Sequence, residues 1–103
     1  MARIDEIRDK IERGQFELSR HAVDQSILRR INLREIREAI EGGKLIEDYP
    51  KDKYGPSCLL LGSTRTGRPV HVHCSYPSRW LIKIITVYEP DPNFWIDFER
   101  RKT

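Results

Sequence analysis

The chain has 103 residues, of which 38% are hydrophobic and 34% charged, and 19 Lys and Arg against 16 Asp and Glu give a net charge of +3. This length suits a single domain over residues 1–103, and the small positive charge permits contact with a polyanion without requiring it. No run approaches the roughly 20 apolar residues of a membrane span, and the N-terminus is charged rather than apolar like a signal peptide, so we expect a cytoplasmic protein with no membrane partner.

The first 43 residues carry the pattern of three helices. Isoleucines recur at helical spacing between charged residues, which predicts a helix over 3–13. Ser19 is a good N-cap for a second helix that ends near Arg30, and Asn32 for a third that stops at Gly42. The apolar stripes of all three helices are expected to face one core.

After these helices the apolar residues alternate as in strands. The candidate strands cover 44–49, 57–63, 69–75 and 80–88. We therefore expect an α+β fold, in which three N-terminal helices pack on one face of a four-stranded antiparallel sheet.

Two hairpins set the expected register of this sheet. A three-residue loop with Gly67 in the left-handed conformation would pair Cys58 with Cys74. A second hairpin would place Ser75 opposite Trp80. Both cysteines are expected to be small buried residues, because the spacing suits no metal knuckle and a cytosolic protein rarely carries a structural disulfide.

The two registers together sort the strands into two faces. The helix-covered face is expected to hold Cys58, Leu60, Val70, Val72, Cys74, Leu81, Ile85 and Val87. Lys83 is the odd member of that face, so either it pairs with an acid such as Glu47, which we favour, or the facing assignment fails there.

The second face is too apolar for a solvated surface and too polar for a sealed core, which indicates a groove. It is expected to hold Leu59, Leu61, His71, His73, Trp80, Ile82, Ile84, Thr86 and Tyr88. A C-terminal segment with Phe94, Trp95 and Phe98 could cover part of it, and we expect residues 99–102 to fray.

Several short blocks stand in a fixed order along the chain. They are FELSRHA at 16–22, RRI at 29–31, IREAIEG at 36–42, IEDYP at 46–50, GPSCLLLG at 55–62, GRPVHV at 67–72 and IITVYEP at 84–90. Together, over about residues 16–95, they resemble the bacterial domain of unknown function 4258. That family is similar to the RelE, MqsR and BrnT toxins. The resemblance implies a compact RelE-like fold, an mRNA-cleaving ribonuclease activity, and a cognate antitoxin protein as partner, often of the zinc-finger type.

Metal-free RNA cleavage needs a base for the 2′-hydroxyl proton, an acid for the leaving oxygen and positive groups on the phosphate. His71 and His73 alternate on one strand and so share a face with Thr86 and Tyr88 of a neighbouring strand. In this hypothesis one histidine is the base, and the other histidine or Tyr88 is the acid. Together with what the resemblance implies, these residues lead us to expect a toxin-like, metal-independent endoribonuclease acting on RNA.

Other residues are candidates for contact with the substrate. Arg68 and Arg79 at the hairpin ends could hold the phosphate, as could Arg30, and Trp80 could stack on a base. His21 belongs to the family's Ser-x-His-Ala signature. It is either a structural hydrogen-bonding residue or a base whose pKa the nearby helix amides depress.

Two other functions stay open at this stage. The same face could be a non-catalytic surface that binds a protein partner or a second copy, and the oligomeric state is left open. A His-x-His pair could also supply two metal ligands, with Cys58, His21 or Glu47 as a third. This is the weakest reading, so we assign no metal ligands and expect no cofactor.

Overall fold

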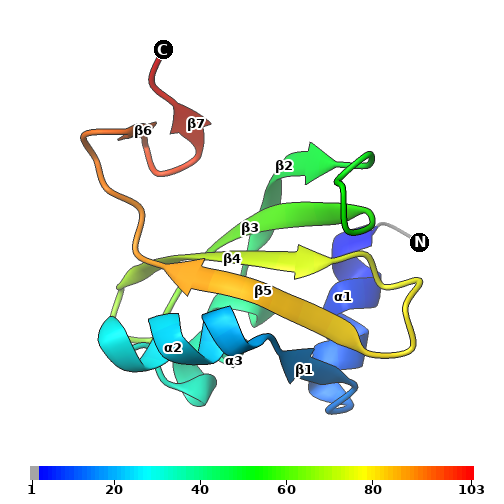
Figure 1. Cartoon of the computed structure of the whole chain (residues 1–103). Coiled ribbons are helices and arrows are strands. Elements are labelled where there is room, and N and C mark those ends of the chain that lie inside the picture. The colour runs from blue at the N-terminus through cyan, green and yellow to red at the C-terminus, as the bar shows by residue number, and fades with distance from the viewer. Residues whose placement is uncertain (1–2) are drawn as a thin grey trace.

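A computed structural model describes residues 3–103 and shows three helices, a five-stranded mixed sheet and a separate two-stranded ladder (Figure 1). The elements in chain order are α1 (Arg3–Glu12), β1 (Phe16–Leu18), α2 (Arg20–Leu28), α3 (Leu33–Glu41), β2 (Lys44–Tyr49), β3 (Ser57–Ser63), β4 (Pro69–Ser75), β5 (Ile82–Tyr88), β6 (Trp95–Ile96) and β7 (Arg100–Arg101). The strand order in the large sheet is β1-β5-β4-β3-β2. Among residues 3–103, none of the helices combines the length and apolar character that a membrane crossing needs.

The predicted four-stranded antiparallel sheet is wrong, because β1 adds a fifth strand that runs parallel to β5. The main-chain N–H of Ser19 donates to the carbonyl of Ile84 at 2.9 Å, and that of Ile82 donates to the carbonyl of Gln15 at 3.1 Å. The sequence gives no clear sign of β1, because three residues are too few to show a period of two.

The predicted starts of the second and third helices are confirmed by their caps. Ser19 accepts a hydrogen bond from the Ala22 N–H at 3.0 Å, and its own hydroxyl donates to the carbonyl of Ile85 at 2.8 Å. Asn32 and Glu35 form a reciprocal capping box at the start of α3. Each cap satisfies main-chain groups that the first turn of a helix leaves without partners.

The helices pack on one face of the sheet and enclose a single core. Its buried members are Ile7, Ile11, Ala22, Ile31, Ile36, Ala39, Ile40, Cys58, Leu60, Val70, Val72, Cys74, Ile82, Ile84 and Val87. Of α2 only Ala22 is buried, whereas Ile27 and Leu28 are 72% and 73% exposed, so the C-terminal part of the predicted apolar stripe faces solvent instead of the core.

The close approach of α3 to β3 depends on a glycine. A Cβ atom at Gly62 would lie 1.7 Å from the carbonyl oxygen of Ala39, a distance that no packed structure allows. Gly62 therefore lets the helix rest directly on the sheet.

The first hairpin has the predicted register, with Cys58 opposite Cys74 and Gly67 at a φ of 86°. The second does not. His73 pairs with Thr86, but the next residue, Cys74, pairs with Ile84, so one extra residue bulges from β5. The predicted pairing of Ser75 with Trp80 is therefore wrong, and β5 begins at Ile82.

This bulge reverses the predicted faces of the first half of β5. Ile82 and Ile84 are fully buried in the core. Lys83 and Ile85 line a cavity on the face of the sheet away from the helices, which we call the open face. Lys83 is thus not a buried charge, and the predicted pair with Glu47 is wrong, since Glu47 binds Arg101 at 3.0 Å.

The C-terminal segment covers part of the open face. This was one of the two expectations for that face, the other being an uncovered groove. Figure 1 shows it (orange to red) leaving the end of β5 and lying on the side of the sheet away from α2 and α3. Trp95 is only 6% exposed, although Phe94 is 67% exposed. Residues 99–102 do not simply fray, because Arg100–Arg101 pair with Trp95–Ile96.

Candidate functional site

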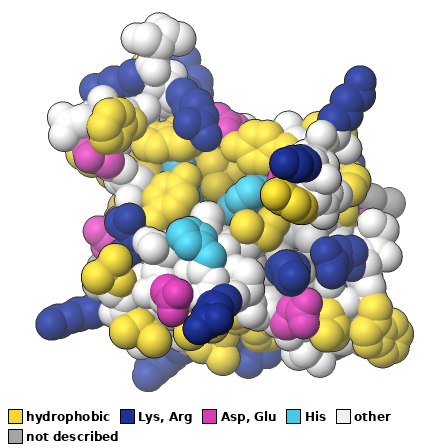
Figure 2. Space-filling model, in the orientation of Figure 1, with side chains coloured by type: hydrophobic (Ala, Val, Ile, Leu, Met, Phe, Trp, Pro, Cys, Tyr) yellow, Lys and Arg dark blue, Asp and Glu magenta, His cyan; other side chains and the backbone are white. Residues whose placement is uncertain are grey.

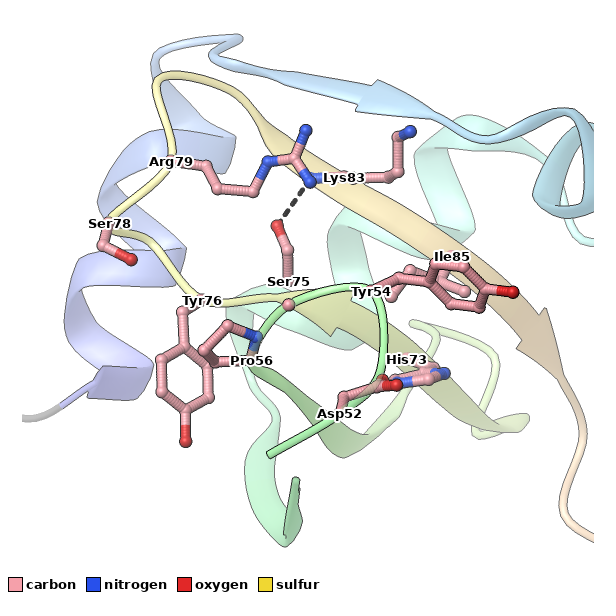
Figure 3. A pocket seen from close by; sticks show the side chains of 11 residues that line it. Asp52, Tyr54, Pro56, His73, Ser75, Tyr76, Ser78, Arg79, Lys83 and Ile85 are labelled. Atoms are coloured by element: carbon pink, nitrogen blue, oxygen red, sulfur yellow. Dashed lines mark hydrogen bonds and ion pairs between the residues drawn. The ribbon is translucent and has the colours of Figure 1, made fainter. Parts of the chain in front are cut away.

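A cavity of about 670 Å³ opens on the face of the sheet away from the helices (Figure 3). The β2–β3 loop, β4, the β4–β5 turn and β5 all contribute to its wall. Its polar and ionisable lining residues are Asp52, Tyr54, His73, Ser75, Tyr76, Ser78, Arg79 and Lys83. Figure 2 shows histidines (cyan) among hydrophobic and basic side chains on the face turned to the viewer.

Hydrogen bonds around His73 define which ring nitrogen carries the proton. The hydroxyl of Ser57 donates to Asp52 Oδ2 at 2.6 Å, so its single proton is already in use. The oxygen of Ser57 must therefore accept from His73 Nε2, which lies 2.9 Å away. This pattern places the ring proton on Nε2 and leaves the lone pair on Nδ1 available.

This group differs from the Ser-His-Asp triad of serine hydrolases. In a triad the histidine lies between the other two residues, whereas here the serine does. Ser57 is fully buried, and His73 Nε2 is 3.9 Å from Asp52 Oδ2. Ser57 thus orients His73 and is not placed to attack a substrate.

The electrostatics favour a neutral imidazole at this position. Burial lowers the pKa of His73 below its ordinary 6.5, although the nearby carboxylate of Asp52 opposes this effect. The pKa of Asp52 is itself lowered, chiefly by the hydrogen bond from Ser57. Near pH 7 the cavity therefore holds a neutral base beside an ionised carboxylate.

Two cationic side chains line the same cavity. Because of the bulge in β5, Lys83 lies on the wall of the cavity, and its main-chain N–H donates to Ser75 Oγ at 2.9 Å (Figure 3). Arg79 comes from the exposed β4–β5 turn. Within residues 3–103 neither Arg79 nor Lys83 forms an ion pair, so both charges are free to bind an anion.

His71 lies on the same face but is closed off from solvent. It is 0% exposed, its Nδ1 is 3.2 Å from Tyr88 Oη, and its Nε2 bonds to the carbonyl of Phe98. Trp95 meets its ring edge-on at 4.5 Å. The structure therefore brings together the predicted pair of His71 and Tyr88, but places it under the C-terminal segment and outside the cavity.

A polar cluster holds the C-terminal segment in place. Arg101 Nε donates to both carboxylate oxygens of Glu47, at 3.2 and 3.0 Å, and the Arg101 guanidinium lies 4.7 Å from the centre of the Trp95 ring. Tyr49 also donates to Glu47, and burial together with this bond raises the pKa of Tyr49 to about 12. The contact between Arg101 and Glu47 joins residues 54 positions apart, which no local sequence pattern reveals.

The predicted phosphate-binding arginines do not converge. Arg68 and Arg79 flank opposite ends of β4, a seven-residue strand about 20 Å long. Arg68 is committed to structure, because it donates to the carbonyls of Arg29 and Arg30 at 2.6 and 2.7 Å and pairs with Glu89.

Three other predicted site residues also lie apart from the cavity wall. His21 and Arg30 are exposed on and after α2, and Arg30 has a φ of 54° at the turn into α3. Trp80 is exposed on the β4–β5 turn, next to Arg79. Thr86 does lie beside the site, as the strand partner of His73.

Sequence reasoning missed Asp52, Ser57 and Tyr54 and noticed Lys83 only as an anomaly. The charge of Lys83 within the apolar strand β5 was the one signal available in the sequence, and the bulge in that strand explains why a charge can lie there. Within residues 3–103 no three His, Cys, Asp or Glu side chains gather as metal ligands would.

Comparison with known proteins gives one match, to a family model. No curated protein and no solved structure matches this chain. The family described as Domain of unknown function (DUF4258) matches residues 18–89, which cover α2 through β5 and hence most of the cavity wall. On this match, the chain belongs to the DUF4258 family.

Proposed function

We propose that this protein is a metal-independent endoribonuclease whose site is the cavity at His73. One observation carries the proposal: a neutral imidazole with a free Nδ1 shares one cavity with Arg79 and Lys83. Cleavage of an RNA phosphodiester requires a base, an acid and positive groups on the phosphate, and these three side chains can supply them.

In the proposed reaction His73 Nδ1 takes the proton of an RNA 2′-hydroxyl. The 2′ oxygen then attacks the adjacent phosphorus, and the bond to the 5′ oxygen of the next nucleotide breaks. Arg79 and Lys83 neutralise the charge that grows on the phosphate oxygens, and the ammonium of Lys83 donates a proton to the leaving oxygen. The products are a 2′,3′-cyclic phosphate and a 5′-hydroxyl.

The cellular role we propose is that of a toxin held in check by a cognate antitoxin protein. Its support is the resemblance of the sequence blocks to a family akin to the RelE, MqsR and BrnT toxins. The net charge of only +3 favours action on free RNA over action on the ribosome.

The test is cleavage of an end-labelled RNA by purified protein in the presence of EDTA. His73→Ala and Lys83→Met should each abolish or strongly reduce cleavage. His21→Ala is the matched control, because this histidine is exposed and outside the cavity. A 2′-deoxy nucleotide at the cut position should block the reaction.

Circular dichroism is the check that each variant is folded. Cleavage that persists in folded His73→Ala would refute the site. Intact RNA with folded wild-type protein, together with unimpaired growth on induced expression, would refute the nuclease.

A second candidate function is a non-catalytic module that binds a protein, and the exposed surface of α2 favours it. Val23, Ile27 and Leu28 are exposed there, with Arg29 and Arg34 nearby along the chain. Such a surface suits an apolar helix flanked by acidic residues. A tight complex that Ile27→Ser disrupts, without any RNA cleavage, would support this candidate over the first.

A further inference from the structure

We propose that the cavity accepts single-stranded RNA and that Tyr54 is the residue that stacks on the base beside the cleaved phosphate. This inference rests on the proposed nuclease function and names its substrate class. The edge of the cavity carries one large, exposed aromatic ring, that of Tyr54.

Tyr54 lines the cavity but is 85% exposed. Its loop is nevertheless ordered. The N–H of Gly55 donates to the carbonyl of Asp52 at 3.0 Å, and the N–H of Tyr76 donates to the carbonyl of Pro56 at 3.1 Å. Because these hydrogen bonds fix the main chain of the loop, little backbone entropy is lost when a base binds to the exposed ring.

The same loop is connected to His73 through side chains. Asp52, two residues before Tyr54, accepts the hydroxyl of Ser57 at 2.6 Å, and Ser57 in turn fixes His73 at 2.9 Å. Figure 3 shows Tyr54, Asp52 and His73 around one opening. A base stacked on Tyr54 would therefore have a defined position relative to His73 Nδ1, the atom that takes the 2′-hydroxyl proton.

The size and charge of the cavity suit a nucleotide. Its volume of about 670 Å³ lies within the range of small-molecule sites. In the proposed complex Arg79 and Lys83 bind the phosphate of the nucleotide, while Tyr54 stacks on its base. Lys53 Nζ lies 5.5 Å from the centre of the Tyr54 ring, which leaves the opposite ring face for the base.

Stacking on a side chain requires a base with a free face, and this distinguishes single strands from duplexes. In a duplex both faces of each base are covered by its neighbours, whereas in a single strand the bases are free to turn outward. The site is therefore expected to reject double-stranded RNA.

The experiment is fluorescence anisotropy with a labelled, non-cleavable 2′-O-methyl single strand. Tyr54→Ala should weaken binding roughly 5- to 150-fold, the equivalent of about 1–3 kcal/mol per stacked base. Tyr54→Phe should retain it. An abasic strand of equal length should bind wild type and Tyr54→Ala alike. Trp80→Ala and Phe94→Ala are the controls, since both rings are exposed outside the cavity.

Other outcomes separate this inference from the proposed function. Equal binding of the base-bearing strand by wild type and Tyr54→Ala would overturn the stacking role while the nuclease stands. The same holds if Trp80→Ala, and not Tyr54→Ala, removes binding, or if a duplex binds as well as the single strand. No binding of any strand by folded protein would overturn both.

Discussion

The Nε2 atom of His73 lies 2.9 Å from the hydroxyl oxygen of Ser57, a residue 16 positions away on the neighbouring strand. Because Ser57 gives its own proton to Asp52, this contact fixes one tautomer of the imidazole. Removing the hydroxyl should let the ring rotate or change tautomer without creating a large cavity. The reactive nitrogen would then be misplaced in part of the molecules.

We therefore predict that Ser57→Ala lowers cleavage about tenfold or more, which corresponds to at least ~1.4 kcal/mol of transition-state stabilisation. Ser57→Thr, which keeps the hydroxyl, should restore much of the rate. The pH profile should also shift in Ser57→Ala, because Asp52 loses the hydrogen bond that lowers its pKa. An unchanged rate and profile would show that Ser57 does not position His73.

The stability of the fold should fall as the pH drops below about 6.5, the ordinary pKa of histidine. Burial lowers the pKa of both His71 and His73 in the folded chain. The unfolded chain therefore takes up more protons over this window, and stability is lost as the pH falls from 6.5 through the folded-state pKa values. The lowered pKa values of Asp48 and Asp52 act only at lower pH, near and below 4.

Urea unfolding at pH 5, 6 and 7 measures this dependence. His71→Asn and His73→Asn should each reduce its slope, whatever they do to stability at pH 7. A slope that stays the same in both variants would assign the effect to other groups.

The local parts of this fold were predictable from sequence, because a cap or a tight turn is decided within a few residues. Ser19, Asn32 and Gly67 each act on their immediate neighbours and were placed correctly. Which side chains of β5 point into the core was not predictable in the same way. Its segment Leu81 to Ile85 is apolar at both odd and even positions, so alternation alone fits either face until the bulge is known.

The geometry of the candidate site was predictable to a similar degree. Strand alternation placed His73 on the face of the sheet away from the helices, where it lines the cavity. Its connection to Asp52 depends on how a seven-residue loop folds back on the sheet, and the closure of His71 depends on Arg101 reaching Glu47. Contacts of this kind require the assembled structure, because no spacing in the chain encodes them.

Gly62 should tolerate no side chain. A Cβ atom there would lie 1.7 Å from the carbonyl oxygen of Ala39, so α3 would have to move off β3. We predict that Gly62→Ala lowers the free energy of unfolding by about 1–3 kcal/mol or more. Gly42→Ala is the matched control, since nothing lies within 4 Å of its Cβ position and its φ is −100°. Equal urea midpoints for the two variants would contradict this account of the helix–sheet contact.

Trp95 should shield His71 from solvent and hold the C-terminal segment on the sheet. It is 6% exposed and meets the imidazole edge-on at 4.5 Å, so Trp95→Ala removes a buried ring and opens the C-terminal segment. The loss of stability should be about 3–5 kcal/mol, whereas Phe94→Ala, at a residue 67% exposed, should cost no more than about 0.5 kcal/mol.

The titration of His71 provides the sharper measurement. Burial is the main cause of its lowered pKa, so in Trp95→Ala the pKa should rise toward the ordinary 6.5, while Phe94→Ala leaves it unchanged. The imidazole signals of His71 and His73, followed by NMR over pH, report the two sites separately. If Trp95→Ala raises the pKa of His71 alone, the C-terminal segment closes one histidine and leaves the other open to substrate. If both or neither respond, the two histidines share one environment, and the division of this face into a closed part and an open part is wrong.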